Sequence, residues 1–95
     1  MKVVYPAFFH YENGGFWVEF PDLPGCVSQG DSEVEVYRNA CEALELFLQD
    51  DYTVANLPPA SPLRKIEATG RDFSSLVSAD FSENITHEPA RRLAL

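Results

Sequence analysis

The sequence predicts a small α+β domain with element order β-β-β-α-β, in which a four-stranded sheet of strand order 3-2-1-4 carries one main helix packed on one face. Three features predict it. Two apolar and aromatic runs flank an Asn-Gly pair, a return rich in proline and glycine follows, and an amphipathic helix pattern then separates two further strand patterns. At 95 residues, of which 45% are hydrophobic, the chain has the size and composition of one globular domain.

The N-terminal part is predicted to form a β-hairpin. Residues 3–11 and 16–20 are rich in β-branched and aromatic side chains, and Asn13-Gly14 between them is typical of a tight turn. A two-residue turn and a four-residue loop over 12–15 give the same register. One face then carries the side chains that cover the core (Ala7 opposite Phe20, Phe9 opposite Val18, Tyr11 opposite Phe16), and the other face carries Phe8, His10, Trp17 and Glu19.

A structured bend is expected over Pro21–Gly25, because two prolines remove N–H donors that a central strand needs. The bend leads into a short third strand over Cys26–Gln29. Its proline and glycine residues favour a structural role, in which Asp22 hydrogen-bonds its own following backbone. In the alternative interpretation, Asp22 and Leu23 are exposed and form part of a binding edge.

The main helix is predicted to open at Gly30-Asp31-Ser32, with Asp31 or Ser32 as the N-cap, and to run to about Asp50. Apolar side chains recur at the spacing of one buried stripe: Val36, Ala40, Ala43, Leu44 and Phe47. A second row lies beside it: Val34, Tyr37, Cys41 and Leu48. This second row either widens the core stripe or faces a partner.

No regular structure is predicted for the segment after the helix. Leu57–Pro62 contains three prolines, which end the helix and form a stiff, extended connection. Residues 63–72 are expected to be irregular, with a turn at Thr69-Gly70.

A fourth strand is expected over Leu76–Phe81, which Ser74-Ser75 could extend. We expect it to lie beside the first strand through a right-handed parallel crossover. The domain then spans residues 1–81, and residues 82–95 form a short C-terminal tail that could fold as one helix.

The formal net charge of −8 narrows the classes of partner. Nucleic acid is disfavoured, because its binding depends on lysine and arginine neutralising phosphates. A basic protein would be attracted, although the same charge also serves solubility. No apolar run approaches the ~20 residues that cross a membrane, and the N-terminus lacks a signal-peptide pattern, so a cytoplasmic protein is expected. Cys26 and Cys41 fit neither a disulfide framework nor a zinc set and are expected to be two buried thiols.

One block, from Gly14 to Leu44, carries a family resemblance. Its matching residues are Gly14-Gly15, Glu19-Phe20-Pro21-Asp22-Leu23-Pro24-Gly25-Cys26, Gln29-Gly30-Asp31, Asn39-Ala40 and Glu42-Ala43-Leu44. The block resembles the core of the HicB antitoxin family, strongly over about the first half of the chain and weakly as far as Phe81. The resemblance implies a partial ribonuclease-H-like fold. It also implies a type II antitoxin that binds and inhibits a small, basic, HicA-type toxin, which cleaves messenger RNA.

A ribonuclease-H-like fold raises the question of a metal-dependent nuclease. Such an enzyme needs clustered carboxylates around two Mg²⁺ ions, and one of these carboxylates must come from the first strand. Residues 1–11 contain no Asp or Glu, and Asp80 and Glu19 would each stand alone. A Cys26 nucleophile would need His10 as its base, and nothing in the sequence brings the two together. We therefore expect no enzyme activity, no cofactor and no metal site.

The residues expected to bind the partner are Phe8, Trp17, Glu19, Asp22 and Leu23. Aromatic anchors and charged residues of this kind carry much of the energy of an interface. Trp17 could instead pack beneath the tail or the 63–72 loop. The exposed aromatic residues and an open sheet edge also favour a homodimer or higher homo-oligomer.

The segment after Phe81 is too short for the DNA-binding domain that many members of the HicB family carry, so direct DNA binding is not expected. The alternative function is an orphan scaffold domain, oligomeric and binding a ligand or protein, that has no toxin partner. The sequence does not separate this alternative from the antitoxin, because both need the same fold.

Overall fold

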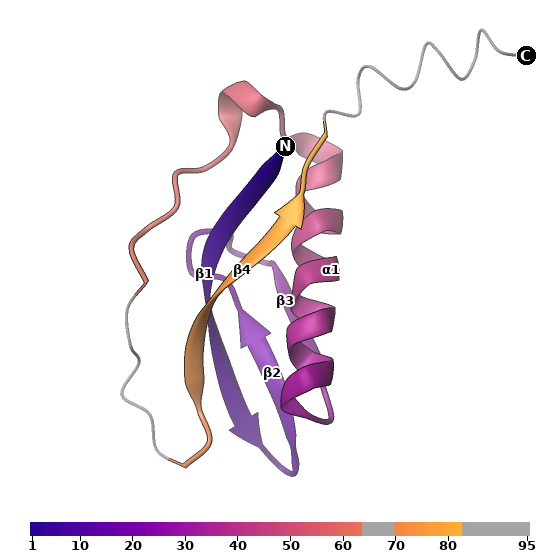
Figure 1. Ribbon diagram of the computed structural model, residues 1–95, viewed down its shortest axis with the longest axis vertical. Helices are drawn as coiled ribbons and strands as arrows, with labels where there is room; N and C mark the ends of the chain where they lie inside the picture. The colour runs from indigo at the N-terminus through magenta and orange to yellow at the C-terminus, as the bar shows by residue number, and fades with distance from the viewer. Residues whose placement is uncertain (64–69, 83–95) are drawn as a thin grey trace, which may run out of the picture.

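The computed structural model describes residues 1–63 and 70–82 (Figure 1). The elements follow one another as β1 (Lys2–Glu12), β2 (Gly15–Glu19), β3 (Val27–Gly30), α1 (Glu33–Asp51), the 3-10 turn η1 (Val54–Asn56) and β4 (Phe73–Asp80). The strands form one sheet in the order β3-β2-β1-β4, and α1 lies along one face of it. The predicted α+β class, the strand order 3-2-1-4 and the single main helix are confirmed.

The β1–β2 hairpin has the predicted register. Phe9 pairs with Val18 and Tyr11 with Phe16, and the ladder ends at the pair Phe8–Glu19, just before the expected contact of Ala7 with Phe20. At the turn, Asn13 has φ 54° and Gly14 has φ 81°. Two consecutive residues in the left-handed region are what a two-residue type I′ turn requires, so the shorter of the two expected turns forms.

β4 lies beside β1 as expected, but the two strands are antiparallel, so the predicted parallel crossover is wrong. The path of the chain after α1 explains the difference. Figure 1 shows residues 52–63 passing down the side of the sheet away from α1, back toward the β1–β2 turn. β4 therefore starts at the turn end of the sheet, with Phe73 opposite Phe9, and runs back to the pair Lys2–Asp80.

The bounds of all four strands differ slightly from the prediction. β3 covers Val27–Gly30 and so starts and ends one residue later than expected. β4 starts at Phe73 and includes the expected extension at Ser74-Ser75. The chain turns at Gly70-Arg71 just before β4, while Thr69 and the tail helix expected within 82–95 fall outside the described residues, apart from Ser82.

The core lies between α1 and the facing side of the sheet. Val36, Ala40, Leu44 and Leu48 are all 0% exposed, which adds Leu48 to the predicted stripe and removes it from the second row. The strands contribute the facing side chains: Val3, Tyr5, Ala7, Phe9, Phe16, Val18, Val77 and Ala79. Ala43 and Phe47, also predicted for the stripe, are partly buried at its margin.

The start of α1 is fixed by local contacts. Ser32 is the N-cap, and its hydroxyl oxygen accepts a hydrogen bond from the Glu35 N–H at 3.1 Å. At Gly30, an added Cβ would lie 2.5 Å from the backbone nitrogen of Val36, so only glycine lets the helix pass this close to the end of β3. The Asn39 side-chain amide donates to the Gln29 carbonyl at 2.8 Å and ties α1 to this edge strand.

The outer ends of β1 and β4 are joined by two backbone hydrogen bonds. The Met1 ammonium donates to the Phe81 carbonyl at 2.8 Å, and the Phe81 N–H donates to the Met1 carbonyl at 2.7 Å. These bonds continue the β1–β4 ladder by one step beyond Lys2–Asp80. No helix in the described part of the chain combines the length and the apolar character needed to cross a membrane.

Candidate partner-binding surfaces

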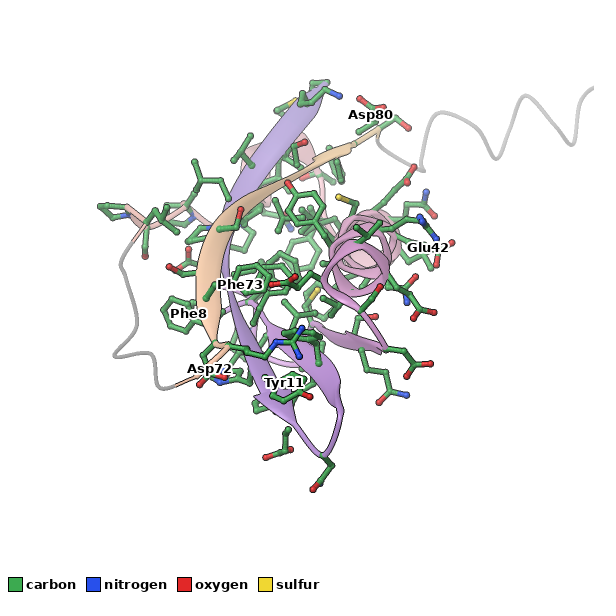
Figure 2. All side chains as sticks on the ribbon, turned by 60° about the horizontal axis from the view of Figure 1, so that its bottom comes forward. Phe8, Tyr11, Glu42, Asp72, Phe73 and Asp80 are labelled. Atoms are coloured by element: carbon green, nitrogen blue, oxygen red, sulfur yellow. The ribbon has the colours of Figure 1, made fainter. Side chains whose placement is uncertain are left out.

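The sheet face away from α1, called here the open face, carries the aromatic residues expected at the partner surface. Phe8 and His10 come from β1, and Trp17 and Glu19 come from β2. All four are half-buried. Figure 2 shows Phe8 pointing away from α1. Of the five residues expected to bind the partner, four are half-buried: Phe8, Trp17, Glu19 and Asp22.

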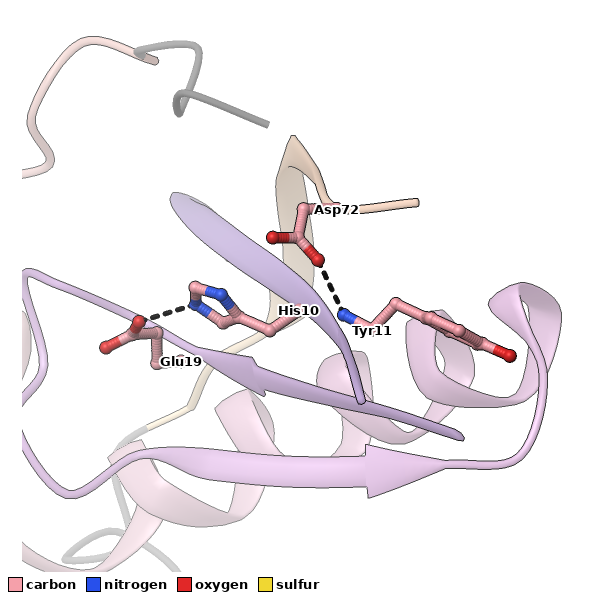
Figure 3. Close-up of polar contacts among 4 residues, drawn as sticks. All are labelled: His10, Tyr11, Glu19 and Asp72. Carbon is pink, nitrogen blue, oxygen red and sulfur yellow. Dashed lines mark hydrogen bonds and ion pairs between the residues drawn. The ribbon is translucent and has the colours of Figure 1, made fainter. Parts of the chain in front are cut away.

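Three side chains of the open face form a linked row. The His10 imidazole stacks on the Trp17 ring with centroids 4.2 Å apart and planes inclined by 20°. His10 Nε2 lies 2.7 Å from Glu19 Oε2 (Figure 3). The row gives Trp17 a fixed neighbour on one side, and the Glu19 carboxylate already has a partner within the protein.

Apolar side chains surround this row. Residues alternate between the two faces of a strand, so Val4, Val27 and Leu76 lie on the same side of the sheet as Phe8. Each of the three is exposed, with Val27 at 58%. The open face therefore offers apolar surface from every strand of the sheet.

Leu23 is not available to a partner, and the expectation that it is exposed is wrong. It is 1% exposed and belongs to the core. The reason is a pair of successive turns, in which the Leu23 N–H donates to the Phe20 carbonyl and the Cys26 N–H donates to the Leu23 carbonyl. Pro24 and Gly25, with φ 96° at the glycine, occupy the two central positions of a type II turn, and the reversal points Leu23 inward.

Asp22 holds the chain segment that follows η1. Its two carboxylate oxygens accept hydrogen bonds from the Ser61 N–H at 2.8 Å and from the Ser61 hydroxyl at 2.7 Å. The expected bond to its own following backbone is replaced by this long-range contact. A second contact lies close by, where the Tyr5 hydroxyl donates to the Pro58 carbonyl. Both contacts fix the path that makes β4 antiparallel to β1.

The residues considered for catalysis lie apart. Cys26 is 2% exposed, and burial raises the pKa of its thiol to about 11, so the thiolate needed for nucleophilic attack is suppressed near neutral pH. His10 faces Glu19 on the opposite side of the sheet. Cys41 is half-buried, and burial raises its pKa as well. Within residues 1–63 and 70–82, no group of three His, Cys, Asp or Glu side chains is arranged to hold a metal ion.

A second surface, of which the sequence indicated only the part on the helix, lies between the start of α1 and the start of β4. It is a hollow lined by Glu33, Val34, Tyr37, Gly70, Arg71, Asp72 and Phe73, and is called here the α1–β4 hollow. Val34 is 69% exposed, which is unusual for a β-branched apolar residue on a helix. Two of the lining residues belong to the second row of the helix, whose role the sequence left open.

The loop entering β4 is fixed to the hairpin beside this hollow. Asp72 Oδ1 accepts a hydrogen bond from the Tyr11 N–H at 2.7 Å, in the place of a further ladder bond (Figure 3). The Arg71 guanidinium lies over the Tyr11 ring, 4.5 Å from its centroid, and 5.5 Å from that of Phe16. These contacts give the rim of the hollow a defined position.

The model of the HicB-like antitoxin family of bacterial toxin–antitoxin systems matches residues 5–87. The chain belongs to this family. The match confirms the resemblance read from the Gly14–Leu44 block and extends it through β4.

Relatives of this HicB-like antitoxin match parts of it. It is 37% identical over 67 residues to an uncharacterized 14.9 kDa protein of Haemophilus phage HP1, covering 66% of this chain and 48% of the relative. It is 46% identical over 44 residues to a UPF0150 protein of Helicobacter pylori, covering 46% of this chain and 61% of the relative. It is 36% identical over 39 residues to a UPF0150 protein of Synechocystis, covering 41% of this chain and 54% of the relative. The antitoxin thus spans about half the length of the curated relatives it matches.

A solved structure shares the fold. A chain of a toxin–antitoxin complex from Streptococcus pneumoniae superposes on the HicB-like antitoxin with a TM-score of 0.70. The superposition covers 100% of this chain and 90% of the other, at 20% sequence identity. The arrangement of sheet and helix is therefore one that a toxin–antitoxin protein uses.

Proposed function

We propose that this antitoxin binds a small, basic, HicA-type toxin that cleaves messenger RNA, and inhibits it by covering its RNA-binding surface. The observation that carries the proposal is the family match over residues 5–87. The net charge of −8 supports it, because a surface that binds RNA is basic and an acidic inhibitor is attracted to it. A messenger RNA target also favours a cytoplasmic site of action.

The test is co-purification of the chain with the product of the adjacent small, basic open reading frame, followed by an RNA-cleavage assay. We expect a stable complex and loss of cleavage when the antitoxin is added at equal concentration. A basic neighbour that cleaves RNA equally with and without the chain would contradict inhibition. If no partner co-purifies and no toxic neighbour exists, the orphan scaffold is the better description.

We further propose that the open face contributes to binding the toxin or a second copy of the antitoxin. Phe8 and Trp17 would supply aromatic anchors and Glu19 a polar contact at their side. Asp22 and Leu23 would act indirectly, by holding the bend and the segment around Ser61. Trp17→Ala should then weaken assembly by about 2 kcal/mol without unfolding the chain. Complex affinity and oligomeric state that both stay unchanged in a folded Trp17→Ala variant would remove Trp17 from the surface.

A further inference from the structure

We propose that the α1–β4 hollow is the docking site for an apolar side chain that the toxin presents on a basic segment. The inference rests on the proposed function and names a surface through which it would operate. It is independent of the open face, because the hollow lies at the margin between α1 and β4, on the side of the sheet that α1 covers.

The floor of the hollow is apolar and pre-arranged. Tyr37 and Phe73 both stack on Phe9, with ring centroids 6.0 and 4.5 Å away, and Phe9 itself is 0% exposed. The Tyr37 hydroxyl donates to the Leu76 carbonyl at 2.9 Å, which holds this ring against β4. Val34 adds an exposed branched side chain beside them. Because the Tyr37 and Phe73 rings are already held in place, binding an apolar group against them costs little further side-chain entropy.

The rim of the hollow is acidic. Glu33 and Asp72 line it, and a separate hollow around the β1–β2 turn and the start of α1 is lined by three further carboxylates, those of Glu12, Asp31 and Glu35. Within residues 1–63 and 70–82, the ion pairs are Lys2–Asp80 and His10–Glu19, so none of these five carboxylates is in an ion pair there.

Part of this charge has a local role, because acidic residues in the first turn stabilise a helix. Glu33 and Glu35 belong to the first turn of α1, whereas Asp72 and Glu12 lie outside the helix. Among the described residues that line the hollow, Arg71 is the cation, and its guanidinium lies over the Tyr11 ring. An apolar floor with an acidic rim fits an apolar side chain flanked by lysine or arginine.

The same charges argue against other occupants. Nucleic acid would bring phosphates against the rim. A second copy related by a two-fold axis would place one acidic rim against the other, because such an interface joins the same patch on both subunits. Like charges facing each other across an interface disfavour that pairing. A basic toxin meets neither obstacle.

The floor is tested with a matched pair of variants, Val34→Lys and Leu46→Lys. Both residues are exposed on α1, at 69% and 57%, and both changes replace an apolar side chain by the same cation. Leu46 lies about three turns further along the helix and does not line the hollow. The probe is the purified product of the adjacent basic open reading frame, and the readout is the dissociation constant by calorimetry. We expect about 30-fold weaker binding for Val34→Lys and a change of less than about twofold for Leu46→Lys.

The rim is tested by removing two negative charges in two places. Glu33→Gln with Asp72→Asn removes both carboxylates from the rim and leaves a side-chain oxygen at position 72 to accept the Tyr11 N–H. Glu42→Gln with Glu45→Gln makes the same charge change on exposed positions of α1, and Figure 2 shows Glu42 pointing away from the sheet. We expect the rim variant to lower the association rate about tenfold and to flatten its salt dependence, and the control to change the rate by less than about twofold.

The outcomes separate this inference from the proposed function. Wild-type chain that binds and inhibits the toxin, together with Val34→Lys binding as tightly as Leu46→Lys, would overturn the docking site and leave the antitoxin role intact. Equal losses in both lysine variants would also overturn it, since the effect would then not depend on the hollow. Wild-type chain that binds no basic neighbour would overturn the proposed function, and the docking site with it.

Discussion

Phe8 and Phe9 are neighbours in β1, yet they lie in different environments on the two sides of the sheet. Phe9 is 0% exposed, and its ring stacks on Tyr37 from α1 and on Phe73 from β4. Phe8 is half-buried and points away from the helix (Figure 2). The helix side therefore contains the packing that stabilises the fold, while the open face retains aromatic surface that the fold does not fully use. Substitutions of the same kind should separate these two roles.

The largest expected effect is that of Phe9→Ala, compared with Phe8→Ala. Removing the Phe9 ring leaves a cavity in the core, and the free energy of unfolding should fall by about 3–5 kcal/mol. The same change at the half-buried Phe8 should cost about 1–2 kcal/mol, because less area returns to water. Urea denaturation of both variants measures the difference. Equal losses at the two positions would show that the two sides do not differ in their contribution to stability.

Gly30→Ala tests how closely the helix side is packed. The new Cβ would lie 2.5 Å from the Val36 nitrogen, a backbone atom that cannot turn aside, so we expect a loss of about 2–3 kcal/mol. Gly15→Ala is the control, because its Cβ would meet its nearest atom, the Gly30 carbonyl oxygen, at 3.4 Å. Its loss should be smaller than about 1 kcal/mol. Thermal melts that rank the two variants the other way would contradict the close approach of α1.

Asp22→Ala tests the tether between the bend and the following segment. It removes two hydrogen bonds to Ser61 at a half-buried carboxylate, so we expect a loss of about 1 kcal/mol in unfolding free energy. The change should be local, with faster amide exchange at Ser61 and little change in β1. Asp22→Asn, which keeps an acceptor oxygen, is the control. Unchanged exchange at Ser61 in the alanine variant would show that the tether does not hold this segment.

The smallest expected effect on stability at neutral pH is the one that comes from the ionisation of Cys26. Its pKa is raised by burial from 9.0 to about 11, so unfolding releases a proton from this thiol between those values. The contribution of Cys26 to stability is complete below pH 9 and is lost as the pH rises from 9 toward 11. Denaturation series at pH 8 and pH 10.5 should show a smaller pH-dependent loss in Cys26→Ala than in wild type. An identical loss in both proteins would remove Cys26 as the cause.

The local elements could be predicted from the sequence, because their signals lie within a few residues. Asn13-Gly14 fixes the hairpin turn, and Ser32 begins the helix by binding the backbone three residues later. The direction of β4 could not be predicted in this way. It depends on contacts such as Asp22 with Ser61 and Tyr11 with Asp72, which join residues 39 and 61 positions apart.

The candidate surfaces also divide into features that local sequence signals predict and features that depend on residues far apart in the sequence. The open face follows from strand alternation, so Phe8, His10, Trp17 and Glu19 were correctly placed together on one face. Leu23 was misplaced because proline, glycine and aspartate around it indicate an exposed turn, while the turn geometry points its side chain inward. The α1–β4 hollow brings together residues 33–37 and 70–73, and no pattern within either segment indicates the other.

The backbone bonds between Met1 and Phe81 give this part of the chain a mechanical consequence. They lie at one end of an antiparallel strand pair, so a force that pulls residues 1 and 82 apart loads one ladder step at a time. The strands would open as a zipper, from Lys2–Asp80 toward Phe9–Phe73, and would not slide past each other in shear. Phe73 lies at the far end of this zipper, so the α1–β4 hollow would be the last part of the strand pair to come apart under load.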